Sequence, residues 1–246
     1  MCRRIVQQAV EIRENLRVEL TLRGEPTLNP YLLQNLKIIR EVAPKFQISL
    51  FTNGVKFSRN PGLIKSILDA GVNILCVECY NETHSTFQKI AEAAKEVVVD
   101  FRKFSAYRRY SNGHTLRVVN LIPDIMVCDV PVRKIHNNAG NVDGQFLHSR
   151  PGYPSLKLPL QKKCCRPFRE LVVYHTGDVV ICCHDWKAAK ILGNVKQATL
   201  FNIWYGVNHL KVLKHLYGKS RTFLPCSRCD YFGGYRTGLL TDPTKV

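Results

Sequence analysis

The chain has 246 residues, of which 45% are hydrophobic, and it carries a formal net charge of +17. This composition supports a folded core and excludes a disordered chain. No apolar run approaches the ~18 residues of a membrane helix, so no membrane partner is expected. The basic residues attract polyanions non-specifically, but no recognition signature for DNA or RNA accompanies them, so a nucleic-acid role is secondary.

The first 120 residues alternate between two kinds of pattern. Helix-like stretches cover 3–15, 31–43, 61–71 and 85–97. Strand-like runs cover 16–23, 46–54, 72–80, 97–104 and 115–123. This alternation predicts an α/β fold with a parallel sheet, either open or rolled into part of a barrel. Ligands in such folds bind at the C-terminal ends of the strands, where the sequence places 24–26, 52–54, 78–80 and Asn120.

Composition changes after about residue 137. Residues 138–162 are rich in Asn, Gly and Pro and predict an irregular linker between a first domain at 1–137 and a second at 163–246. In the second domain we expect a hairpin around the turn His175–Asp178, a loop over 187–195 and short helices near 200–206 and 210–218. A region this small buries little apolar surface, so we expect a bound metal to stabilise it.

Six of the ten cysteines lie in this second domain. The N-terminal residues read as an amphipathic helix rather than a targeting peptide, so we expect a cytoplasmic protein with reduced thiols and a metal rather than disulfides. Cys226 and Cys229 form a C-x-x-C knuckle. A hairpin also brings a thiol before its first strand close to one after its second, and only one of each adjacent pair should point inward. The candidates are Cys164 or Cys165 and Cys182 or Cys183.

Four thiolates close a tetrahedral zinc site or hold a four-iron cluster, and spacing leaves both metals open. The remaining cysteines carry weaker signals. Cys76 and Cys79 also read C-x-x-C, but positions i and i+3 of a strand face opposite sides, so we interpret them as core thiols. Cys2 and Cys128 are isolated in the sequence and are interpreted in the same way.

The order of these motifs resembles the radical S-adenosylmethionine (radical SAM) enzymes with a C-terminal SPASM, or twitch, domain. "LTLRGEPTLNP", "ISLFTNG" and "GVNILCVECYNETH" are similar to the middle of the radical SAM domain. The second half matches the SPASM pattern of a cysteine, a glycine and a second cysteine, followed by "LGNV", "FNIW" and "CSRC". The resemblance covers residues 16–232 and implies a partial (β/α) barrel of parallel strands with a small cysteine-rich SPASM domain.

The resemblance also implies roles for single residues. It implies an auxiliary [4Fe–4S] cluster held by Cys164, Cys182, Cys226 and Cys229, with Cys164 favoured over Cys165 by the family's C-x-x-P-F pattern. S-adenosylmethionine would bind along a rim formed by Gly24, Glu25, Pro26, Thr52, Asn53, Gly54, Glu78 and Asn120. In the family, the segment that matches Gly24-Glu25 pairs with the methionine amino group, which requires backbone and carboxylate acceptors.

One departure from the family pattern concerns the catalytic cluster. Relatives bind it through C-x-x-x-C-x-x-C upstream of the GEP turn, whereas only Cys2 precedes Gly24 here. We therefore expect an N-terminally truncated or degenerate relative whose complete form cleaves S-adenosylmethionine to modify an unknown substrate. Peptides are the commonest substrates of relatives with this second domain. The alternative is a non-catalytic iron–sulfur or zinc protein that binds polyanions.

Overall fold

The computed structural model describes residues 1–79, 89, 92, 105–109, 115–120, 139, 157–231 and 233. The chain divides into two compact units, Met1–Pro131 and Val132–Val246, and each is described by itself. Most of the expected linker at 138–162 and the expected helix at 85–97 lie outside the described residues. Within the described part of the chain, no helix combines the length and the apolar character needed to cross a membrane.

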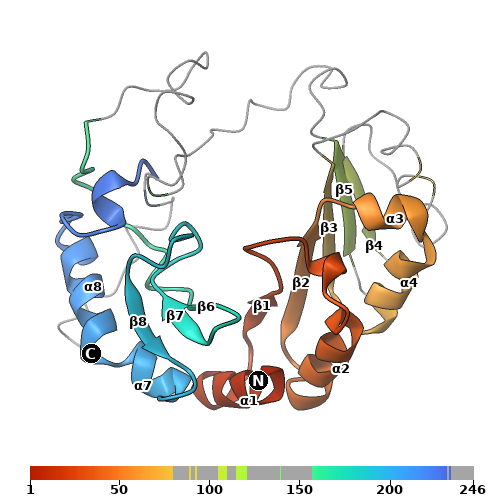
Figure 1. The fold of residues 1–246 in the computed structure, drawn as a ribbon, viewed down its shortest axis with the longest axis horizontal. Helices are drawn as coiled ribbons and strands as arrows, with labels where there is room; N and C mark the ends of the chain where they lie inside the picture. The colour runs from red at the N-terminus through yellow and green to blue at the C-terminus, as the bar shows by residue number, and fades with distance from the viewer. Residues whose placement is uncertain are drawn as a thin grey trace. The chain divides into compact units, whose positions relative to one another are not determined.

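The first unit is built on a five-stranded sheet in the order β1-β2-β3-β5-β4 (Figure 1). Its strands are β1 (Arg17–Glu19), β2 (Gln47–Thr52), β3 (Ile74–Cys79), β4 (Ser105–Arg109) and β5 (Thr115–Asn120). β1, β2, β3 and β5 run parallel, as the sequence predicted. The expectation that every strand is parallel is wrong for β4, which pairs antiparallel with β5 at the sheet edge. The predicted strand at 97–104 lies outside the described residues.

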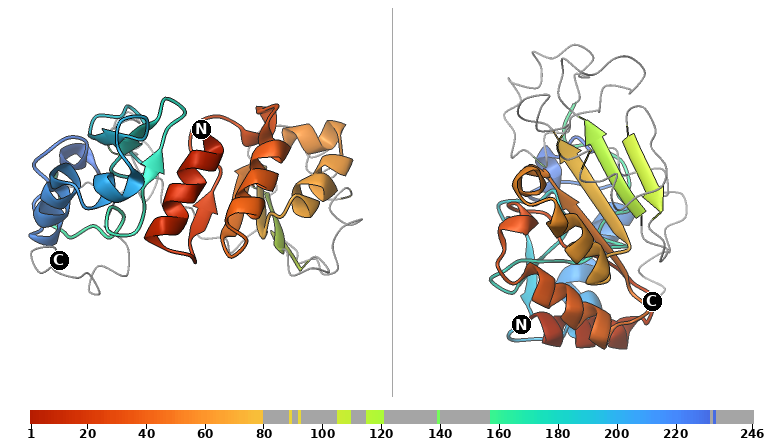
Figure 2. Two further views of the ribbon diagram at one scale, coloured as in Figure 1. Left: turned by 90° about the horizontal axis from the view of Figure 1, so that it is seen from below. Right: turned by 90° about the vertical axis from the view of Figure 1, so that its right-hand side faces the viewer.

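The helices of this unit are α1 (Cys2–Ile12), α2 (Leu32–Val42), α3 (Val55–Arg59) and α4 (Gly62–Asp69). Three of them overlap the predicted stretches, with α1 beginning one residue earlier than predicted, whereas α3 was not predicted. It begins directly after Gly54, where Asn53 Oδ1 accepts a hydrogen bond from Val55 N at 2.9 Å. α2 and α4 lie against one face of the sheet (Figure 2). The three- and four-residue apolar spacing predicted this packing.

The core of the first unit is formed by apolar side chains from both layers. β2 and β3 contribute side chains that are fully enclosed, and the facing sides of α2 and α4 complete the layer. The fully buried members are Leu36, Ile48, Leu50, Phe57, Ile64, Ile67, Leu68, Val72, Leu75 and Val77. Because apolar burial contributes ~25 cal/mol per Å², this two-layer contact is the main source of stability for the sheet that carries the rim.

The second unit contains a three-stranded antiparallel sheet of β6 (Val172–Val173), β7 (Asp178–Val180) and β8 (Ile191–Asn194). It is followed by α7 (Leu200–Trp204), α8 (Val207–Tyr217) and the 3-10 turn η3 (Cys226–Arg228). The predicted hairpin and both helices are confirmed, and Gly177 has the positive φ, +95°, that the turn requires. The expectation of a loop over 187–195 is wrong, because four of its residues form β8 against β7.

Candidate functional site

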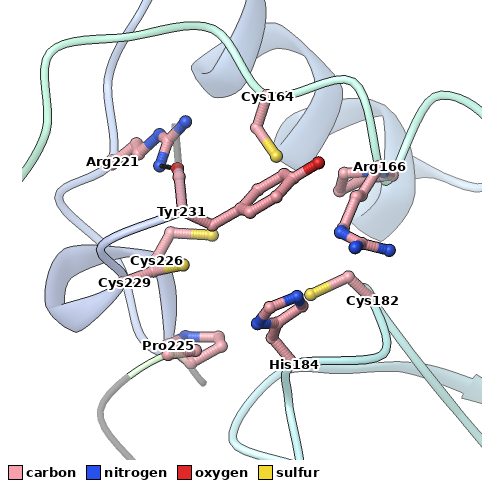
Figure 3. Close-up of a pocket in the computed structure, with 11 residues that line it drawn as sticks. Cys164, Arg166, Cys182, His184, Arg221, Pro225, Cys226, Cys229 and Tyr231 are labelled. Carbon is pink, nitrogen blue, oxygen red and sulfur yellow. Dashed lines mark hydrogen bonds between the residues drawn. The ribbon is translucent and has the colours of Figure 1, made fainter. Parts of the chain in front are cut away.

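The four thiols favoured by the sequence line one pocket of the second unit. Cys164 comes from the segment before β6, Cys182 from the turn after β7, and Cys226 and Cys229 from η3 and its end. Figure 3 shows the four sulfurs directed toward a common space from these separate segments. Residues that are 65 positions apart in the sequence, Cys164 and Cys229, thus meet at one site.

The other member of each adjacent pair is not part of the pocket lining. Cys165 is buried, and its backbone N–H donates to Gly233 O at 3.0 Å. Cys183 Sγ accepts a hydrogen bond from Arg166 Nη1 at 3.0 Å. Strand alternation, the reason given above for choosing one cysteine of each pair, does not apply, because all four residues lie in loops outside β6 and β7.

Arg221 fixes the segments that bear the first and last thiols relative to each other. Its side chain is only 2% exposed and donates to three backbone carbonyls: Lys162 O (2.8 Å), Lys163 O (3.0 Å) and Tyr231 O (2.6 Å). Two of these acceptors precede Cys164 and the third follows Cys229. A guanidinium with every nitrogen engaged in this way is a rigid clamp, because its planar fork loses little freedom on binding.

Gly233 allows the segment after Cys229 to approach the backbone of Lys163 and Cys164. Its φ is +92°, and a Cβ on it would lie 2.0 Å from Lys163 O and 3.1 Å from the Cα of Cys164. No side chain can occupy that space, so only glycine allows the two backbones to approach. The first glycine of "FGG", Gly233, therefore has a geometric reason that the sequence alone did not reveal.

The pocket thiols lie in an environment that disfavours bare thiolates. Burial raises the pKa of Cys164 to about 11 and raises the pKa values of Cys182, Cys226 and Cys229, and neighbouring thiols add to the effect for Cys164, Cys182 and Cys226. The nearby positive charge of Arg221 lowers the pKa of Cys164, Cys226 and Cys229 in part. A metal that binds four thiolates would supply the remaining positive charge.

The four thiols form the donor set of the pocket. Among the residues that the structure describes, no three His, Cys, Asp or Glu side chains converge closely enough to hold a single metal ion. The four thiols instead surround a pocket. A polynuclear cluster fits this arrangement, because each iron of a four-iron cluster takes one of four cysteines. Four thiols around one pocket are the donor set that a four-iron cluster takes.

Four polar or aromatic side chains also line the pocket, and the sequence reasoning missed all of them. They are Arg166, His184, Arg221 and Tyr231. Arg166 lies over the Tyr231 ring, 4.7 Å from its centroid, and the His184 and Tyr231 rings are 5.3 Å apart. The only sequence signal for them was proximity, since three of the four are within two residues of a pocket cysteine.

A second group of predicted residues lies at one edge of the sheet in the first unit. Parallel pairing puts the ends of β1, β2, β3 and β5 at the same edge. The loops 24–26 and 52–54 follow β1 and β2, while Glu78 and Asn120 lie at the ends of β3 and β5, with Asn120 paired in register with Cys79. The structure therefore brings the predicted rim positions to one edge, and their role toward a cofactor stays a prediction.

Glu25 connects two of these loops directly. Its Oε1 accepts hydrogen bonds from Thr27 N (3.0 Å), Thr27 Oγ1 (2.7 Å) and Thr52 Oγ1 (2.5 Å). Its Oε2 accepts from Asn53 N at 2.8 Å. The Glu25 carboxylate thus connects the two loops of the rim through hydrogen bonds. The sequence predicted a contact with the amino group of a cofactor, and did not predict these hydrogen bonds within the protein. Gly24 and Gly54 both adopt positive φ, +78° and +76°.

The weaker cysteine interpretations agree with the structure where it describes them. Cys76 is buried in β3, 1% exposed, and Cys2 is half-buried in α1, with its Sγ 3.9 Å from Asn35 O. Cys128 lies outside the described residues. Neither Cys2 nor Cys76 lines the pocket of the second unit.

Comparisons with known proteins agree with the site geometry. Residues 164–230 match the SPASM family, described as an iron–sulfur cluster-binding domain. Two similar solved chains are BtrN in complex with AdoMet and 2-DOIA (TM-score 0.65, 19% identity, 94% of this chain and 78% of that chain) and selenomethionine BtrN in an open conformation (TM-score 0.62, 15% identity, 98% and 84%). No curated protein matches the chain significantly.

These findings confirm the resemblance at two levels. The sequence match coincides with the segment that brings four cysteines around one pocket. The structural likeness to BtrN extends over nearly the whole chain. Because the sequence identities are only 19% and 15%, this likeness shows a shared fold. Residues 164–230 therefore match the SPASM iron–sulfur cluster-binding domain, and the chain shares the fold of BtrN.

Proposed function

We propose that the second unit holds one [4Fe–4S] cluster through Cys164, Cys182, Cys226 and Cys229. The observation that carries this proposal is the convergence of these four side chains, from three separate segments, on one pocket. When bound, the cluster supplies a one-electron redox centre or a substrate-binding surface. Arg221 and Gly233 position the ligand-bearing segments, as their contacts require.

The experiment is a set of single Cys→Ser variants, reconstituted anaerobically with iron and sulfide. Replacing Cys164, Cys182, Cys226 or Cys229 should reduce bound iron and sulfide at least several-fold relative to the unmodified chain. Cys165→Ser and Cys183→Ser are matched controls, because each lies next to a proposed ligand but outside the pocket lining. Retention of the full cluster in any of the four ligand variants would exclude that residue. Loss in Cys165→Ser with retention in Cys164→Ser would reverse the choice within that pair.

For the first unit we propose binding of S-adenosylmethionine at the rim of a partial (β/α) barrel. The likeness to BtrN, solved with AdoMet, and the common edge of loops 24–26 and 52–54 support this. A protein of this kind would reductively cleave the cofactor to modify a substrate, for which a peptide is our proposal. The rim residues are Gly24, Glu25, Pro26, Thr52, Asn53, Gly54, Glu78 and Asn120.

The 246-residue chain contains no C-x-x-x-C-x-x-C segment. Three thiolates are needed to leave one iron open to the cofactor, so this chain should bind at most one cluster and should not cleave S-adenosylmethionine. The measurement is formation of 5′-deoxyadenosine after reduction with dithionite. Its appearance would contradict the ligand count. The second candidate function, a non-catalytic iron–sulfur protein that binds polyanions, is favoured by the charge of +17.

A further inference from the structure

The two arginines that line the cluster pocket differ in how their donors are used. Arg221 places Nε, Nη1 and Nη2 on backbone carbonyls, so its hydrogen-bonding capacity is directed into the fold. Arg166 also lines the pocket, but its buried Nε has no hydrogen-bond partner among the described residues. A buried unpaired donor usually costs ~1–3 kcal/mol, so a site that retains one commonly uses it.

The surroundings of Arg166 hold its guanidinium at the pocket wall. Nη1 donates to Cys183 Sγ at 3.0 Å and lies 3.3 Å from Glu170 Oε2. The guanidinium lies over the Tyr231 ring, 4.7 Å from its centroid. Figure 3 shows Arg166 on the side of Cys182 and Arg221 on the side of Cys226 and Cys229. The positive charge of Arg166 is therefore held beside the ligands by its contacts with Cys183, Glu170 and Tyr231.

Glu170 limits the effect of this charge. The Arg166–Glu170 pair is partly exposed, with 27% and 32% of the two side chains accessible, and Glu170 Oε1 also lies 3.3 Å from Cys183 N. The carboxylate thus neutralises part of the guanidinium charge on the side of Cys183, next to the ligand Cys182. The two residues together form a charged pair beside the cluster, and each member should act on it with opposite sign.

We propose that Arg166 raises the reduction potential of the cluster and that Glu170, which partly neutralises the charge of Arg166, lowers it. This inference rests on the proposed cluster in the pocket. Reduction adds one electron, and therefore one negative charge, to a centre held by four thiolates. Arg166 stabilises the reduced form by its positive charge and its available N–H donor, because cluster potentials depend on net charge and on hydrogen bonds to sulfur.

The test is the midpoint potential of the reconstituted chain, titrated anaerobically with dithionite and mediators and followed by electron paramagnetic resonance. Arg166→Gln should shift the midpoint to more negative values by at least a tenfold change in the equilibrium constant, which is 59 mV for one electron. Glu170→Gln should shift it in the positive direction. Arg169→Gln is the matched control: it removes the same charge from an exposed position three residues away, where water and salt screen it.

The outcomes separate this inference from the proposed function. A wild-type chain that takes up no iron would refute the proposed cluster and the inference with it. An Arg166→Gln chain with full iron and an unchanged midpoint would overturn the inference alone. If Arg166→Gln does not load, Arg166→Lys keeps the charge and should load with a midpoint closer to wild type. Failure of both variants to load would identify Arg166 as a packing residue and overturn the proposal. Equal shifts in Arg166→Gln and Arg169→Gln would also overturn it, because they would reflect net charge only.

Discussion

Single charged side chains hold backbone segments together at both candidate sites. In the first unit, Glu25 binds the loop at 52–54 through Thr52 Oγ1 and Asn53 N. In the second, Arg221 binds the backbone on both sides of the cluster pocket. Neither role could be predicted from the sequence, because the partners of a charged side chain depend on which loops the fold brings together.

The Glu25 contacts predict a measurable contribution to stability. Glu25→Gln keeps the shape of the side chain but replaces one acceptor oxygen by a donor, so one of the bonds from Thr52, Thr27 or Asn53 is lost. The free energy of unfolding of the first unit, followed by circular dichroism, should fall by ~1–3 kcal/mol. Glu41→Gln is the control, since its pair with Arg3 is exposed and should contribute less to stability. Equal losses in the two variants would contradict the structural role of Glu25.

Arg221→Gln should have a larger effect, because the buried Arg221 is the charged donor to three backbone carbonyls, those of Lys162, Lys163 and Tyr231. The free energy of unfolding of the second unit should fall by more than ~3 kcal/mol. Both tryptophans of the chain, Trp186 and Trp204, lie in this unit, so tryptophan fluorescence in urea reports its unfolding alone. Exposed Arg169→Gln should change it by less than ~0.5 kcal/mol. A loss below 1 kcal/mol for Arg221→Gln would show that the clamp is dispensable.

The elements of the fold differ in how far the sequence predicts them. Helices of two or more turns, such as α2, and the buried parallel strand β2 were predicted, because their apolar residues repeat long enough to define a period. The five-residue α3 is too short for a period, and β8 (Ile191–Asn194) contains a glycine and ends in asparagine. β8 exists because tertiary contacts favour it: Asn194 Nδ2 donates to Asp178 Oδ1 at 2.8 Å.

The turn between β6 and β7 gives a prediction at the scale of elements. Gly177 has φ +95°, and a Cβ on it would lie 2.8 Å from Asn194 Oδ1, so Gly177→Ala meets both backbone strain and a contact with β8. It should lower the free energy of unfolding of the second unit by ~1–3 kcal/mol. Gly218→Ala, with φ −74° at the end of α8 and no contact under 3.5 Å, should change it by less than ~1 kcal/mol. An unchanged Gly177→Ala variant would mean that the turn adopts another conformation.

His209 joins α8 to the segment that carries Cys164. Its Nδ1 lies 2.7 Å from Trp204 O and its Nε2 2.8 Å from Pro167 O. Burial lowers the pKa of His209 from its usual value. The stability that neutral His209 contributes is therefore present above pH ~6.5, the pKa of histidine in the unfolded chain. It is lost as the pH falls through the lower pKa of His209 in the folded chain. The stability of the second unit should fall below pH ~6.5, and His209→Gln should remove most of this pH dependence. Exposed His215→Gln should leave it intact.

At the scale of the whole molecule, the sequence predicted the domain at the C-terminus better than the site within it. The spacing of Cys164, Gly177, Cys182 and the final C-x-x-C indicated a metal-binding unit, and the structure places those four cysteines around one pocket. The pocket wall was not predictable in this way. Arg166 and Tyr231 line the pocket because of how the loops fold, which no local sequence pattern predicts. Gly233 is required only because the backbone of Lys163 lies against it.

The most direct test of the central claim is the native mass of the chain after anaerobic reconstitution, with iron and sulfide offered together with zinc. A cluster held by four thiolates predicts a single loaded species whose added mass equals about four irons and four sulfides per chain. In the Cys226→Ser and Cys229→Ser variants this species should disappear. A chain that carries one zinc ion instead, with the added mass unchanged by iron and sulfide, would contradict the account.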